Sequence, residues 1–172
     1  MPKRPIPGQA RCRVARLLGA VLLLGASHAS AWQLELGAGP VDEIDGVRSR
    51  SAALLLLSEG RHPWELSAGW IAPRRARALR TPSTRFLAVG RRFSHGRFFL
   101  SSGIAVVDRR SEALSSHHQF MTGLGWRLGR LTIGIRHLSN ANTAGRNRGE
   151  NLLWIALPAA LSRLRGRRLS SA

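Results

Sequence analysis

Apolar and polar residues alternate along short segments through much of the chain, and turn residues separate these segments. Successive side chains of a β-strand point to opposite faces, so the alternation predicts strands rather than helices. Eight strands are expected, at residues 32–39, 48–57, 63–71, 84–93, 97–107, 118–128, 131–140 and 151–157. Strands of about ten residues with turns between them are typical of a transmembrane β-barrel.

The expected connections alternate in length. Those after the second, fourth and sixth strands are tight, whereas the others form longer polar loops at residues 40–47, 72–83, 108–117 and 141–150. Short periplasmic turns and long extracellular loops are typical of outer-membrane barrels. We therefore expect an all-β protein, an eight-stranded antiparallel transmembrane β-barrel of the outer-membrane type over residues 32–158, with both chain termini on the periplasmic side.

The two faces of the expected strands differ in chemistry. Trp64, Leu66 and Trp70 share one face of the third strand, and Glu65 lies on the other. A bulky apolar face and a small polar face fit lipid outside and a narrow polar interior, where we expect Arg136 and Arg127 to line the wall against Glu35 and Glu65. A soluble eight-stranded barrel has the same period but fills its interior with the bulky residues, and it is the alternative fold.

Residues 1–31 have the parts of a cleaved secretory signal: a basic stretch, the apolar stretch LLGAVLLLGA at residues 17–26, and the cleavage site Ala29-Ser30-Ala31. The apolar stretch is too short to span a bilayer as a helix. Cys12, the only cysteine, lies in this signal. The mature chain therefore has no thiol for disulfides, thiolate catalysis or zinc–cysteine sites. Residues 159–172 are a basic C-terminal tail, which we expect to be solvated.

The mature chain is strongly basic. Removal of the signal leaves 22 of the 27 Lys and Arg residues and all nine acidic residues, a net charge of +13. Such a charge attracts anionic partners in general. An exported chain seldom meets nucleic acid, whereas a bacterial envelope contains phosphorylated lipopolysaccharide. We therefore expect an anionic lipid as partner and no nucleic acid.

The strand at residues 131–140 carries the strongest candidate chemistry. His137 and Ser139 lie two positions apart, so they share the face of Ile133 and Ile135, the lipid-facing side. A serine hydroxyl becomes a good nucleophile when a base removes its proton, and an acid must fix the tautomer of that base. Glu150, at the start of the returning strand, is the expected acid. The pattern predicts a serine esterase that works at the surface of a membrane.

Other residues are candidates for supporting roles. Asn140, Asn147 and a backbone N–H of residues 141–143 could stabilise the developing oxyanion. Four arginines of the loop at residues 72–83 could bind phosphates of the substrate, although a solvated basic loop explains them equally well: Arg74, Arg75, Arg77 and Arg80. His117-His118 lacks a third ligand nearby, so we expect no metal and no cofactor.

The segment His137-Leu138-Ser139-Asn140-Ala141, followed by Asn147 and Gly149, resembles the C-terminal signature of lipid A 3-O-deacylases of the PagL type. That family is an eight-stranded barrel of the bacterial outer membrane that hydrolyses the ester-linked hydroxyacyl chain at position 3 of lipid A. The resemblance implies Ser139 as nucleophile, His137 as base, Glu150 as orienting acid and Asn147 near the oxyanion. The matching residues cover only positions 136–151.

One position departs from the family pattern, which places the acid one residue further from the asparagine-x-glycine turn. An alignment without gaps puts Asn151, rather than Glu150, in that position. A slip of one residue moves a strand side chain to the opposite face. Either a shorter loop lets Glu150 reach His137, which we favour, or the triad has lost its acid and Asn151 orients a slower dyad.

Two other functions remain open at this point. The first is a catalytically silent outer-membrane barrel with a structural or adhesive role. The second is a secreted basic protein that binds an anionic polymer. The sequence leaves open which acyl chain or lipid is cleaved, and whether the protein forms a homodimer.

Overall fold

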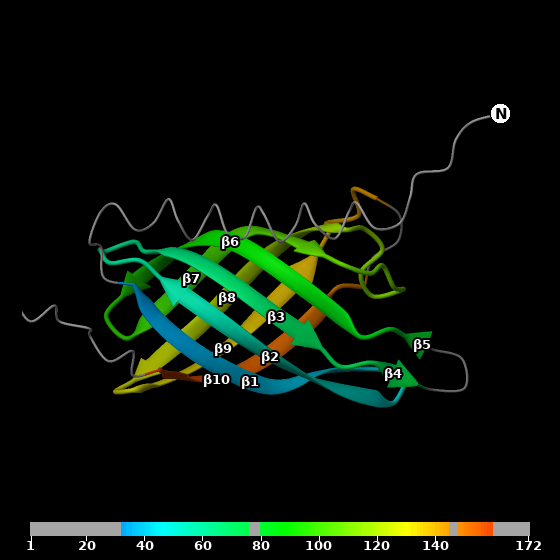
Figure 1. Ribbon diagram of the computed structural model, residues 1–172, viewed down its shortest axis with the longest axis horizontal. Coiled ribbons are helices and arrows are strands. Elements are labelled where there is room, and N and C mark those ends of the chain that lie inside the picture. The colour runs from blue at the N-terminus through cyan, green and yellow to red at the C-terminus, as the bar shows by residue number, and fades with distance from the viewer. Residues whose placement is uncertain (1–31, 76–79, 145–147, 160–172) are drawn as a thin grey trace, which may run out of the picture. The chain divides into compact units, whose positions relative to one another are not determined.

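The structure, a computed structural model, describes residues 32–75, 80–144 and 148–159, all within the unit Trp32–Ala172. Eight antiparallel strands close into a barrel in the order β1-β10-β9-β8-β7-β6-β3-β2 (Figure 1). They are β1 (Gln33–Ile44), β2 (Val47–Leu57), β3 (Trp64–Ile71), β6 (Thr84–His95), β7 (Phe98–Val107), β8 (His118–Leu128), β9 (Leu131–Ser139) and β10 (Glu150–Pro158). The prediction of an all-β, eight-stranded antiparallel barrel is confirmed.

Two predicted segments lie outside the described residues, namely the signal at residues 1–31 and the tail from residue 160 onward. The described part of the chain contains no helix long and apolar enough to span a membrane.

The first connection differs from the prediction. A long polar loop was expected at residues 40–47, but β1 continues to Ile44 and a tight turn leads directly into β2. Asp45 and Gly46 form this turn with φ angles of 51° and 78°. An Asp-Gly pair with positive φ at both positions is a favoured two-residue hairpin turn, because its twist matches that of the flanking strands. The register of β1 shifts between Val41 and Ile44.

The loop at residues 72–83 contains a second, two-stranded sheet. Its strands, β4 (Arg74–Arg75) and β5 (Arg80–Thr81), pair with each other and lie at one end of the barrel (Figure 1). Residues 76–79 between them are outside the described part of the chain.

The outer wall of the barrel is apolar. Large exposed apolar side chains occur on every barrel strand, among them Trp64 and Trp70 on β3 as predicted, and Glu65 between them is fully buried. The exposed large apolar residues of the other strands are Leu36, Leu54, Leu87, Val89, Phe93, Phe98, Leu100, Ile104, Val106, Phe120, Leu124, Trp126, Leu128, Ile135, Leu153, Ile155 and Leu157. In water such a surface would be costly, whereas it suits a hydrocarbon environment.

The inner wall holds a buried network of charges. Glu65 Oε2 accepts hydrogen bonds from Arg92 Nε and Nη2 at 3.0 and 2.8 Å, and Glu65 Oε1 accepts one from Arg136 Nη2. Glu35 lies 3.8 Å from Arg92 Nη1. The predicted position of Arg136 inside the barrel against the acidic residues is confirmed, whereas Arg127 is exposed. The network joins β1, β3, β6 and β9 across the interior, and pairing offsets the high cost of burying each charge.

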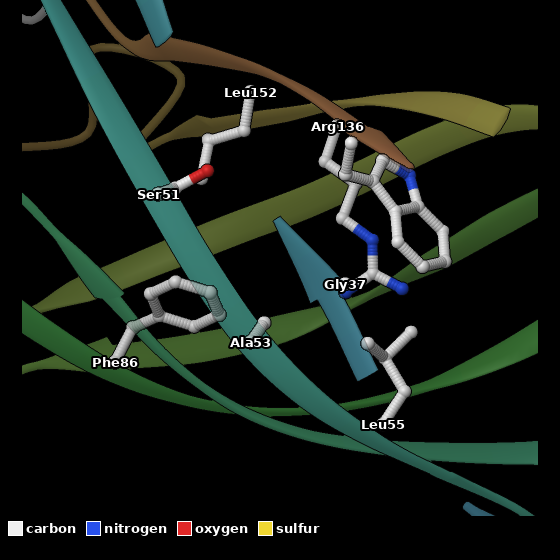
Figure 2. Close-up of a pocket in the computed structure, with 8 residues that line it drawn as sticks. Gly37, Ser51, Ala53, Leu55, Phe86, Arg136 and Leu152 are labelled. Atoms are coloured by element: carbon white, nitrogen blue, oxygen red, sulfur yellow. The ribbon is translucent and has the colours of Figure 1, made fainter. Parts of the chain in front are cut away.

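The interior also holds bulky side chains, so the expectation of a small and polar interior is only partly right. The Trp154 ring lies 4.5 Å below the guanidinium of Arg136. A side chain at Gly37 or Gly134 would collide with this ring, so these glycines make room for it. Arg136 and Gly37 are among the residues that line a small cavity (Figure 2). Its volume is about 10 Å³, which is space for roughly one water molecule. The barrel is therefore tightly packed at this level.

Substitution of Glu65 by Gln should destabilise the barrel, because two buried guanidinium groups would lose their charged acceptor. The expected loss in free energy of unfolding is about 3–5 kcal/mol, the usual result of removing one partner of a buried ion pair. Urea unfolding in lipid vesicles measures this loss. Glu59→Gln, at an exposed position in the turn after β2, is the control and should leave stability unchanged. Equal stability of both variants would contradict a supporting role for the network.

Candidate active site

His137 and Ser139 lie near the end of β9 on its outer side. Their neighbours Arg136 and Leu138 are buried inside the barrel, whereas Ile135 is exposed on the outer wall. The predicted placement of the histidine and the serine on the apolar outer face is therefore confirmed. Both side chains are half-buried.

The side chain that contacts the imidazole is Asn151. It lies directly opposite His137 in the β9–β10 register, and opposite residues of paired strands project from the same face. Asn151 Oδ1 lies 2.8 Å from His137 Nδ1. This is the arrangement that the sequence left as the second alternative.

Glu150 occupies a different place from the one expected. It pairs with Leu138 in the register and therefore faces the interior, where it is buried. Its two oxygens accept hydrogen bonds from Arg74 Nη1 and Nη2 at 2.7 and 2.8 Å. The expected contact between Glu150 and His137 is thus replaced by an ion pair inside the barrel, because strand alternation turns adjacent residues to opposite faces.

Asp42 lies behind Asn151 and was not singled out from the sequence. Its Oδ2 accepts a hydrogen bond from Asn151 Nδ2 at 2.8 Å, and its Oδ1 accepts one from the Asn151 backbone N–H at 3.3 Å. Asp42 belongs to the irregular part of β1, a segment that the sequence predicted as loop. The Asp-Gly turn was the one signal that could have extended the strand to this residue.

Ser139 is followed by a tight turn. The backbone N–H of Ala141 donates to Ser139 Oγ at 3.1 Å. Ala141 and Asn142 have φ angles of 51° and 60°, the left-handed region that is unfavourable for a residue with a Cβ. The hydrogen bond from Thr143 N to Asn140 O closes the turn. The turn therefore directs a backbone donor at the serine oxygen.

The side chain of Asn140 forms hydrogen bonds within the loop that follows β9. It is fully buried, and its Nδ2 donates to Ser115 Oγ and to Ala144 O at 2.9 and 3.0 Å. Its Oδ1 accepts the Asn142 backbone N–H. These contacts stabilise the loop after β9, and the expected role of this side chain at the oxyanion finds no support in its orientation.

The arginine candidates divide into two groups. Arg74 is buried on Glu150, where it cannot reach a phosphate in the membrane surface, so its predicted role is not supported. Arg75 and Arg80 are exposed on the small sheet and remain candidates. Arg77 and Asn147 lie outside the described residues. Within the described residues, no group of three or more His, Cys, Asp or Glu side chains could hold a metal ion.

A closed eight-stranded barrel with an apolar outer wall defines the class of outer-membrane-type β-barrel proteins. The family model described as lipid A 3-O-deacylase (PagL) matches residues 57–158, and the chain belongs to this family. No curated protein and no solved structure matched the chain. The matched region contains Ser139, His137 and Asn151, the partner of the histidine on β10, whereas Asp42 lies before this region.

Gly149 should be essential for the position of the imidazole. Its φ is +75°, and a Cβ there would lie 2.6 Å from His137 Cε1. Gly149→Ala is expected to slow lipid A deacylation about 100-fold, since a displacement of about 1 Å costs this much in a catalytic group.

Gly129→Ala is the matched control for this substitution. Gly129 has a φ of +61° with no atom near the added Cβ, so the backbone strain is the same and the site is untouched. Both variants should lose about 1–2 kcal/mol of stability from backbone strain. Gly149→Ala should lose more, because its Cβ would also lie 2.9 Å from the backbone carbonyl oxygen of Leu138. Equal deacylation rates for the two variants would rule out a role of Gly149 at the site.

Proposed function

We propose that the protein is a serine esterase of the bacterial outer membrane that hydrolyses the ester-linked hydroxyacyl chain at position 3 of lipid A in lipopolysaccharide. Membership in the lipid A 3-O-deacylase family supports the substrate class. The observation that carries the mechanism is an oriented imidazole, two positions from a serine on an apolar outer wall.

The apolar outer wall of the barrel supports the proposal that the protein lies in a membrane. The exposed apolar side chains surround the barrel, and His137 and Ser139 lie near the end from which the loop at residues 140–149 leaves. With the chain termini at the periplasmic side, this end is extracellular. The pair then lies at the level of the outer leaflet, where the acyl esters of lipid A are found. A secreted soluble protein would not expose such a surface.

The chemistry begins with the imidazole. With a hydrogen on Nδ1, His137 donates to Asn151 Oδ1 at 2.8 Å, and Nε2 is left as the proton acceptor. Nε2 removes the proton of Ser139, and Oγ attacks the ester carbonyl. The tetrahedral oxyanion collapses to an acyl-enzyme as the imidazolium returns the proton to the departing sugar oxygen. Water, activated by the same imidazole, then releases the hydroxy fatty acid.

The oxyanion needs donors close to the nucleophile. The Ala141 N–H, directed at Ser139 Oγ, supports a backbone donor from the turn after β9. The family assignment also keeps Asn147 as a candidate, in agreement with the resemblance of the local sequence. Arg75 and Arg80 are the exposed arginines proposed to contact phosphates of the substrate.

Mass spectrometry of lipid A from membranes that carry the protein tests this function. We expect the loss of one hydroxyacyl mass, which Ser139→Ala abolishes because the nucleophile is removed. Ser102→Ala, at an exposed serine of the outer wall on β7, is the control and should leave the product unchanged. Unaltered lipid A, with the protein folded in the outer membrane, would instead favour the catalytically silent barrel.

The two residues at the start of β10 should have separable effects. Asn151→Ala removes the partner of His137 Nδ1 and should lower kcat about 100-fold, because misplacing a catalytic group by about 1 Å costs roughly this much. Glu150→Gln breaks a buried ion pair with Arg74 and should mainly lower stability. Deacylation kinetics and urea unfolding of both variants distinguish these effects. If Glu150→Gln lowered kcat and Asn151→Ala lowered only stability, Glu150 would be the orienting acid instead.

A further inference from the structure

A continuous chain of polar contacts crosses the barrel wall at the site. Inside, Arg74 holds Glu150 with both terminal nitrogens, and its Nη2 also donates to the Asp42 backbone carbonyl at 2.8 Å. The Asp42 carboxylate lies 3.6 Å from the same Nη2. Outside, this carboxylate contacts Asn151, which contacts His137. Asp42 is thus the link between the buried ion pair and the imidazole.

The contacts of Asp42 determine the orientation of the Asn151 amide. A carboxylate only accepts hydrogen bonds, so Asn151 must turn its NH₂ group toward Asp42 Oδ2. Its carbonyl oxygen then faces His137 Nδ1, and this contact requires a hydrogen on Nδ1. The neutral imidazole therefore presents a free lone pair at Nε2, which is the tautomer that a serine base needs.

The carboxylate of Asp42 also supplies negative charge close to the site. Arg74 carries one positive charge and faces two carboxylates, those of Glu150 and Asp42. Arg74 contacts Glu150 at 2.7 Å and lies 3.6 Å from Asp42, so it offsets the charge of Asp42 less fully. An imidazolium that forms during the reaction would be stabilised by this charge through the polarised amide of Asn151.

The irregularity of β1 brings Asp42 to this position. Val41 and Ile44 are both buried, although they are three residues apart, so the register shift between them breaks the regular alternation. Such irregularities re-aim side chains and are common beside active sites. Asp42 is only half-buried, but its carboxylate is held from two sides by Arg74 and Asn151.

We infer that Asp42 is a positioning residue, which acts through Asn151 to hold His137 in the Nδ1–H tautomer and to supply the negative charge of the triad. The inference rests on the proposed function for the identity of the nucleophile and the base. The acid of the triad is then divided between two residues, an amide in contact with the histidine and a carboxylate behind it.

The purified full-length protein in detergent micelles allows two tests. Labelling by a fluorophosphonate reports the reactivity of Ser139 without reference to the substrate, and Ser139→Ala sets its background. Asp42→Asn should slow both labelling and deacylation by up to about 100-fold, the cost of a catalytic group displaced by about 1 Å, with KM within about twofold of the original value. Glu43→Gln removes a neighbouring charge that pairs only with exposed Arg48 among the described contacts, and it should leave both rates unchanged.

A charge-swap variant separates positioning from general support of the fold. In Asp42→Asn/Asn151→Asp the amide and the carboxylate exchange places. The carboxylate at position 151 then contacts His137 directly, and the amide at position 42 donates a hydrogen bond to this carboxylate. We expect this double variant to regain most of the labelling rate that Asp42→Asn loses. A double variant as slow as Asp42→Asn, or an Asp42→Asn variant that labels at the original rate, would overturn the inference.

The unmodified protein provides a test that needs no substitution. The ¹⁵N NMR spectrum of the His137 imidazole should show the neutral Nδ1–H tautomer, and the Nε2–H tautomer would overturn the inference. Rapid labelling of Ser139 that Asp42→Asn slows, together with unchanged lipid A, would mean that the proposed substrate is wrong while the role of Asp42 stands. Normal deacylation by Asp42→Asn would mean that the proposed substrate is right and that Asp42 has no positioning role.

Discussion

The strict alternation of side chains along paired strands is the constraint on which this site depends. In a closed barrel each residue shares its face with the residue opposite it on both neighbouring strands. Asn151 lies opposite His137 and therefore outside, whereas Glu150 lies opposite Leu138 and therefore inside. The side chains of these two adjacent polar residues therefore lie on opposite sides of the barrel wall. Asn151 belongs to the candidate site, and Glu150 lies in the buried interior.

The buried charges give the barrel a rigid frame for its outer surface. Glu65 joins Arg92 and Arg136 across the middle of the interior, and Arg74 joins Glu150 near the end that carries the site. Charges in a tightly packed interior are stable only in one geometry, so they restrict the relative positions of the strands. A site that is built on strands held in this way needs little reorganisation before it binds a lipid.

The site also shows how a departure from the family pattern is accommodated. Asn151 stands where the resemblance leads one to expect an acid, and an uncharged partner alone would orient the histidine without supplying charge. The carboxylate of Asp42 lies directly behind this amide, on the neighbouring strand β1. The barrel is closed by β1 and β10, so its first and last strands lie side by side at the site.

The sequence by itself determined the eight strands and the outward placement of His137 and Ser139, because the two-residue period of a strand is a local property of the chain. It also predicted Arg136 inside against Glu65. Only the tertiary structure decided that Asn151 contacts the histidine, that Arg74 turns inward, and that Asp42, 109 positions away from Asn151, completes the arrangement. These contacts depend on strand register, on the irregularity in β1 and on closure of the barrel, which join distant segments that no local pattern connects.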